Sequence, residues 1–143
     1  WIFINWEGVE ASKKNIGLEL YKMSDFGIPY SYSPILFSSN DYINNNSNAV
    51  KKFIESSRKG YTYCYENMDE AVSILNKFVP ITDKGIDLIE CLKISIDHFG
   101  PRDDFGKINL EKINIFLKWL EKNNIENKSF KAKDIISDKA LLF

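Results

Sequence analysis

The residue types best suited to chemistry lie together near the start of the chain, in the segment Asn5-Trp6-Glu7. The apolar run Trp1–Ile4 before them is expected to be a buried strand, and residues 7–14 suit a short helix. In open α/β sheets, ligands bind at the carboxyl ends of strands, beside helix N-termini. An indole offers a stacking face, and an amide and a carboxylate offer hydrogen-bonding groups. The pattern therefore indicates a site for a flat, nitrogen-rich heterocycle whose exocyclic amine donates to the carboxylate.

The same three residues also allow a purely structural explanation. Trp6 would then be a core residue and Asn5 would cap the helix. Glu7 would interact favourably with the positive end of the helix dipole. Composition by itself slightly favours this second explanation.

A second candidate lies in residues 25–33, where Gly27 and Pro29 restrict the backbone. In an extended conformation, Tyr30 and Tyr32 would project to the same side and could line a cleft. A half-buried strand edge explains the two tyrosines equally well.

Motifs of catalytic and metal sites are absent from the sequence. It contains no glycine-rich phosphate loop, no H-E-x-x-H pair, no C-x-x-C and no Gly-x-Ser-x-Gly elbow. The one histidine, His98, precedes Phe99-Gly100-Pro101. Its imidazole is expected to interact with the carbonyl groups at the end of a helix. Asp103-Asp104 is expected to be a solvated loop, and Cys64 and Cys91 are too widely spaced for a zinc site. We therefore expect no catalytic residue, no metal ligand and no cofactor.

Length and charge exclude several classes of protein. The chain has 143 residues, which is roughly one domain. Nineteen basic residues balance 20 acidic ones, so no nucleic-acid partner is expected. No apolar run approaches the roughly 18 residues of a membrane helix. The chain begins at Trp1 within an expected strand and has no signal-peptide pattern, so we expect an internal cut in a longer protein.

The predicted elements form an α/β chain, with a few strands followed by about five helices. Alternating apolar residues predict further strands at 17–23 and 33–38. Three strands offer too little sheet surface for the apolar faces of five helices. Some of these helix faces are therefore expected to pack on strands outside this chain. The helices are expected over residues 48–66, 71–78, 83–99, 110–120 and 132–142.

Polar residues and breakers predict where these helices begin and end. Ser47 would cap the first helix, Asn67 with Glu70 would form a capping box for the second, and Thr82 or Asp83 would cap the third. Breakers are expected to end helices at Pro80, Gly100 and Pro101. The expected buried stripes are Ile89, Leu92, Ile96 and Phe99 in the third helix, and Leu110, Ile113, Leu117 and Leu120 in the fourth.

A series of short motifs covers nearly the whole chain in a recognisable order. They are Asn5-Trp6-Glu7-Gly8-Val9-Glu10, Asp25-x-Gly27-x-Pro29, Val50-x-x-Phe53, Gly60-Tyr61, Asp69-Glu70-Ala71, Pro80 and Trp119-Leu120. This series resembles the second half of the thiamine-pyrimidine branch of type II periplasmic binding proteins. That branch contains receptors for formylaminopyrimidine-like precursors that feed ABC importers, and also hydroxymethylpyrimidine phosphate synthases.

The resemblance implies a fold of two α/β lobes joined by crossover strands, with the ligand held between them. This chain would be the C-terminal portion of that fold. Residues 1–25 would end the second lobe, 26–38 would form the hinge or crossover strand, and 39–143 would be helices packing on the first lobe.

The resemblance also implies a function. Asn5, Trp6, Glu7 and Tyr30 match positions that contact ligand, in the substrate-binding component of an ABC importer for a thiamine pyrimidine precursor. The implied partners are a pyrimidine-like ligand and the importer's permease, and the implied location is extracytoplasmic. An enzyme is disfavoured because residues 28–33 contain no cysteine or histidine, whereas the synthases carry a cysteine-rich cluster there.

Three alternatives remain beside this one. The chain could belong to a biosynthetic synthase-like protein, or to a binding protein for another small organic solute. It could instead be a self-sufficient helical interaction module. A homo-oligomer that buries exposed apolar faces against a second copy would favour a part of a larger protein over such a module.

Overall fold

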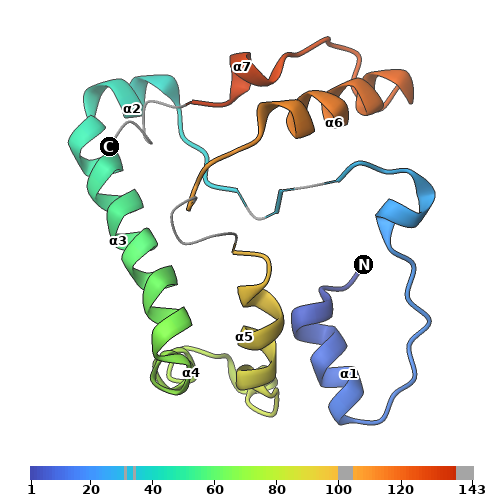
Figure 1. Ribbon diagram of the computed structural model, residues 1–143, viewed down its shortest axis with the longest axis vertical. Helices are drawn as coiled ribbons and strands as arrows, with labels where there is room; N and C mark the ends of the chain where they lie inside the picture. The colour runs from blue at the N-terminus through green and yellow to red at the C-terminus, as the bar shows by residue number, and fades with distance from the viewer. Residues whose placement is uncertain (31, 34, 100–104, 138–143) are drawn as a thin grey trace. The chain divides into compact units, whose positions relative to one another are not determined.

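The computed structural model describes residues 1–30, 32–33, 35–99 and 105–137 (Figure 1). Its contacts divide the chain into two compact units, which are described separately below. Unit 1 combines Trp1–Glu19 with Glu55–Phe105, and unit 2 combines Leu20–Ile54 with Gly106–Phe143.

Helices make up the regular structure of the described residues. The short turns are a π-helix, η1 (Ile4–Gly8), and the 3₁₀ helices η2 (Met23–Phe26) and η3 (Ile81–Asp83). The α-helices are α1 (Val9–Lys13), α2 (Asn40–Asn45), α3 (Ser47–Glu66), α4 (Met68–Leu75), α5 (Leu88–Ile96), α6 (Leu110–Lys122) and α7 (Ala132–Ile135).

The described residues contain no β-strand, so the strands predicted at 1–4, 17–23 and 33–38 are wrong wherever the structure describes them. A strand needs a neighbour that pairs with its N–H and C=O groups, and an alternating sequence does not supply one. At the start of the chain, the Phe3 carbonyl instead accepts hydrogen bonds from the N–H groups of Trp6 and Gly8, at 3.1 and 3.2 Å. The described part of the chain is therefore α-rich, and an α/β class is not confirmed for it.

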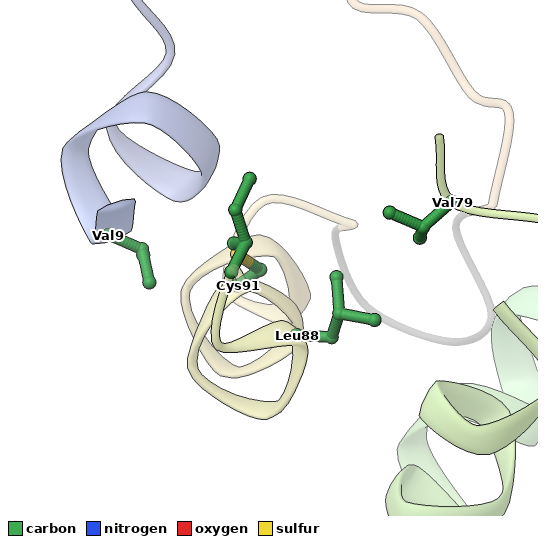
Figure 2. Close-up of a cluster of buried hydrophobic side chains, with 5 residues drawn as sticks. Val9, Val79, Leu88 and Cys91 are labelled. Carbon is green, nitrogen blue, oxygen red and sulfur yellow. The ribbon is translucent and has the colours of Figure 1, made fainter. Parts of the chain in front are cut away.

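A small apolar cluster forms the core of unit 1. Figure 2 shows Leu88 and Cys91 of α5 between Val9 of α1 and Val79. Ile86 completes the buried set, and Trp6, Val72 and Ile94 pack against it while remaining partly exposed. The cluster thus joins the start of the chain to residues 79–91, and hydrophobic burial stabilises this contact.

Helix α5 begins later than expected, because its N-cap is Asp87. The Asp87 carboxylate accepts a hydrogen bond from the Glu90 N–H at 3.1 Å. The prediction of Thr82 or Asp83 as the cap was wrong, since both lie in η3, which directly follows Pro80. A 3₁₀ turn followed by a bend at residues 84–86 separates Pro80 from the helix.

The later start also changes which face of α5 is buried. Leu88 and Cys91 are the buried residues of the helix. The predicted stripe was wrong in register, because Ile89, Leu92 and Ile96 are only half-buried.

Phe99, the last residue of the predicted stripe, belongs to an aromatic cluster with α3. Its ring meets Tyr61 edge-on, with centroids 4.6 Å apart, and Tyr65 at 5.9 Å. Tyr61 also contacts Phe105 at 4.9 Å. The Tyr65 hydroxyl donates to the Ile96 carbonyl at 3.3 Å, which ties α3 to the end of α5. Edge-to-face pairs stabilise such clusters beyond the area that they bury.

The long helix α3 confirms the prediction for residues 48–66, but the predicted caps around it were wrong. Ser47 is the first residue of the helix itself. Asn67 makes no capping hydrogen bond to α4, and its amide donates instead to the Tyr63 carbonyl at 3.4 Å. Glu70 accepts a hydrogen bond from the Tyr63 hydroxyl, which raises the pKa of that phenol. The Tyr63 carbonyl, which also accepts a hydrogen bond from the Asn67 backbone N–H at 2.8 Å, thus binds the side chain that was predicted to cap α4.

In unit 2, helix α6 confirms the predicted start at Asn109. The Asn109 side chain accepts hydrogen bonds from the Glu111 and Lys112 N–H groups, at 2.9 and 3.1 Å. Of the predicted stripe, Ile113, Leu117 and Leu120 are half-buried, whereas Leu110 is exposed.

Helix α7 packs on α6 through its first residue. The Ala132 N–H donates to the Asn114 side chain at 2.8 Å, and Ala132 is fully buried. The helix predicted over 132–142 is thus present at 132–135, and its last residues lie outside the described part. The predictions for Gly100, Pro101 and Asp103-Asp104 also lie outside it.

None of the helices in the described ranges is both long and apolar enough to cross a membrane.

We predict that Leu88→Ala lowers the free energy of unfolding by about 2–4 kcal/mol, because it removes a buried side chain from a small cluster. Chemical denaturation of the chain measures this change. Lys93→Ala, on the exposed side of the same helix, serves as the control and should stay within about 0.5 kcal/mol of the wild type. Equal losses in both variants would show that α5 does not anchor unit 1.

Candidate functional site

Asn5, Trp6 and Glu7 lie on the single π-helical turn η1, which runs directly into α1. A hydrogen bond of 3.2 Å from the Gly8 N–H to the Phe3 carbonyl closes this wide turn. The helix predicted over 7–14 is confirmed at 9–13 by α1, but residues 7 and 8 lie in a π turn that no sequence pattern indicated. Single π turns are rare and occur frequently at functional sites.

The side chain of Asn5 connects η1 to α5. Its Nδ2 donates a hydrogen bond to the Ser95 hydroxyl at 2.8 Å. That hydroxyl in turn donates to the Cys91 carbonyl at 2.7 Å. Asn5 therefore does not cap a helix, as the structural explanation supposed; it links two separate elements.

Glu7 stabilises the same turn from the outside. Its Oε2 accepts a hydrogen bond of 2.8 Å from the Phe3 N–H, although the side chain remains exposed. A carboxylate offers two acceptor oxygens with several lone pairs, so this bond leaves acceptor capacity for another donor.

Trp6, between them, is half-buried and packs against the core cluster of unit 1. The structural explanation is thus confirmed in this respect. The ring nevertheless retains exposed surface, and a half-buried indole can contact the core and a ligand at once. The turn therefore combines an aromatic surface, a carboxylate and an anchored amide within three residues.

Tyr30 belongs to unit 2, where it contacts helix α6. Its ring meets Phe116 edge-on, with centroids 5.8 Å apart. Phe116 and Trp119 of α6 are nearly parallel, at 7° and 6.3 Å. Tyr32 accepts a hydrogen bond of 3.0 Å from the Asn109 N–H at the start of the same helix. Neither tyrosine lies in a strand. Tyr30 contacts Phe116, which in turn lies against Trp119.

Sequence reasoning missed two features of these surroundings. The parallel rings of Phe116 and Trp119 follow from their spacing of three residues on a helix, a signal that the sequence does contain. Ser95 gave no such signal, because it lies 90 residues from its partner Asn5.

The chain's two cysteines have little nucleophilic character. Burial raises the pKa of the Cys64 thiol. Burial, reinforced by the negative charge of Asp87, raises the pKa of the Cys91 thiol. Only the thiolate is a good nucleophile or metal ligand, so both groups are mainly inert thiols at neutral pH.

Other chemistry-bearing groups are scattered. His98 is exposed just after α5, and its backbone N–H donates to the Ser95 carbonyl at 2.9 Å. Within the described ranges, no three histidine, cysteine, aspartate or glutamate side chains are grouped so that they could hold a metal ion. The groups that η1 presents are an amide, an indole and a carboxylate, which can stack and form hydrogen bonds.

Comparison with known proteins shows which family this segment resembles. Residues 1–71, which include the η1 turn and Tyr30, match the model of the family described as NMT1/THI5 like. This match confirms the resemblance to the solute-binding family related to thiamine pyrimidines.

A particular relative agrees with that resemblance. A formylaminopyrimidine-binding protein of Halalkalibacterium halodurans is 23% identical to this chain over 141 aligned residues. The alignment covers 94% of this chain and 42% of the relative, so the chain spans less than half of the relative's length.

We predict that both cysteines react with iodoacetamide several-fold more slowly than free cysteine at neutral pH, because their raised pKa values reduce the thiolate fraction. Mass spectrometry of Cys64→Ser and Cys91→Ser measures each rate separately. The reaction rates should still increase with pH above the ordinary pKa of a thiol. In denaturant they should equal the rate of free cysteine. A rate equal to that of free cysteine in the folded chain would contradict this description.

Proposed function

We propose that this chain forms part of the ligand site of a solute-binding protein for a thiamine pyrimidine precursor, of the formylaminopyrimidine or hydroxymethylpyrimidine kind. The observation that carries the proposal is the η1 turn, which holds Asn5, Trp6 and Glu7 within the segment that matches the family. The name of the bacterial relative supports the choice of ligand class.

Each residue has a distinct role in this proposal. The exposed part of the Trp6 indole stacks on the pyrimidine ring. Glu7 accepts a hydrogen bond from the exocyclic amine, and Asn5 contacts the polar edge of the ring. The Phe3–Glu7 and Asn5–Ser95 hydrogen bonds support these roles, because they restrict the side chains before a ligand arrives.

The rest of the site follows from the two-lobed architecture that the resemblance implies. Residues 1–25 would end one lobe, 26–38 would cross between the lobes, and the helices of 39–143 would pack on the other lobe. Tyr30 would then lie near the hinge and help to close the cleft over the ligand. Its contact with Phe116 supports this role by holding one edge of the ring.

We further propose that the protein delivers its ligand to the permease of an ABC importer at the extracytoplasmic face of the membrane. Binding fits the described residues better than catalysis does. Both cysteines have raised pKa values, and residues 28–33 contain neither cysteine nor histidine.

We predict that Glu7→Gln weakens the binding of hydroxymethylpyrimidine by about 10- to 100-fold, because a hydrogen bond to a charged group contributes about 1.5–3 kcal/mol. Glutamine keeps an oxygen that can accept from the Phe3 N–H, so the turn itself should persist. The thermal shift of the full-length protein with increasing ligand measures the change.

Glu10→Gln is the matched control, because Glu10 lies one turn further on and pairs with Lys14 at the surface, at 2.6 Å. This variant should bind like the wild type. The proposal fails if no pyrimidine or thiamine precursor stabilises the wild-type protein, or if the two variants bind equally well.

A further inference from the structure

The structure assigns to Ser95 the role of a positioning residue: it fixes the Asn5 amide so that the carbonyl oxygen, Oδ1, is turned away from α5 as a hydrogen-bond acceptor. The consequence for the ligand rests on the function proposed above. The hydrogen-bond network itself does not, because it involves side chains and backbone of unit 1 alone.

The Ser95 hydroxyl has a single proton to donate. Two polar atoms lie close to this oxygen: the Asn5 side chain at 2.8 Å and the Cys91 carbonyl at 2.7 Å. A carbonyl oxygen can only accept, so the contact with Cys91 uses the hydroxyl proton. The Ser95 oxygen must therefore accept from Asn5, and only the Nδ2 end of the amide can donate.

The opposite orientation of the amide is excluded on the same grounds. If Oδ1 faced Ser95, one proton would have to serve two acceptors. One of the two oxygen–oxygen contacts would then be repulsive at less than 3 Å. A serine that bonds back to the carbonyl four residues earlier is common in helices, and α5 supplies it here.

This fixed orientation determines whether Asn5 offers a ligand a hydrogen-bond donor or an acceptor. With Nδ2 held by Ser95, Oδ1 points elsewhere and can accept a hydrogen bond. Glu7, which follows Trp6 in η1, is also an acceptor. In the proposed site both acceptors contact the ligand that stacks on Trp6. They therefore favour a heterocycle that carries an amine over one that carries an oxo group in the same place.

Without Ser95 the amide could rotate by 180° and offer a donor instead. The part of the selectivity between an amine and an oxo group that Asn5 contributes is then lost, because the flipped amide satisfies either ligand, whereas the part contributed by Glu7 remains. Ser95 thus acts on the ligand through Asn5 and does not touch it.

The test compares Ser95→Ala with Ser95→Thr in the full-length protein. Calorimetric titration uses two probes: hydroxymethylpyrimidine and its analogue in which an oxo group replaces the exocyclic amine. We expect the wild type and the threonine variant, whose hydroxyl can make the same two bonds, to prefer the amine by at least about tenfold. The alanine variant should show a several-fold smaller preference, because only the contribution of Glu7 remains.

A second measurement does not depend on the ligand. In the nitrogen–proton spectrum, the side-chain amide protons of Asn5 should exchange slowly in the wild type and in Ser95→Thr, and rapidly in Ser95→Ala. An unchanged preference together with unchanged exchange in Ser95→Ala would overturn the inference. If the wild type binds neither probe, the proposed function is overturned, and the exchange rates alone then decide whether Ser95 orients Asn5.

Discussion

The contact between η1 and α5 is the interaction on which the candidate site depends. The π turn is short and its backbone bonds are few, so it needs support from another element. Two kinds of contact supply that support: the burial of Trp6 against the core cluster, and the chain of hydrogen bonds from Asn5 through Ser95 to Cys91. Because α5 begins at Asp87, the same helix presents Leu88 and Cys91 to the core and Ser95 to the turn.

The structural and functional explanations of Asn5, Trp6 and Glu7 are compatible. Each side chain has one structural partner: Ser95 for Asn5, the core for Trp6, and the Phe3 N–H for Glu7. Each also retains a group that a ligand can use, namely an amide oxygen, part of an indole and a carboxylate oxygen. Structural contacts of this kind fix a side chain in advance and so reduce the entropy that binding costs.

The sequence predicted most of the helices, but the caps predicted for α3, α4 and α5 were wrong and the longer-range features were missed. Asn109 marked the start of α6 because a cap acts on residues directly after it. The expected strands failed because a strand requires a neighbour that alternation does not reveal. In the candidate site, residue types singled out Asn5-Trp6-Glu7, but neither the π turn nor Ser95 was predictable, since both depend on packing between distant segments.

The central claim is that Trp6 contacts a pyrimidine ligand, and its fluorescence tests this most directly. In a full-length protein whose other tryptophans, including Trp1 and Trp119, are replaced by phenylalanine, Trp6 alone reports on the site. The account predicts saturable quenching as hydroxymethylpyrimidine is added, because the ligand ring would stack on the indole. Calorimetric evidence of binding with no change in Trp6 fluorescence would contradict it.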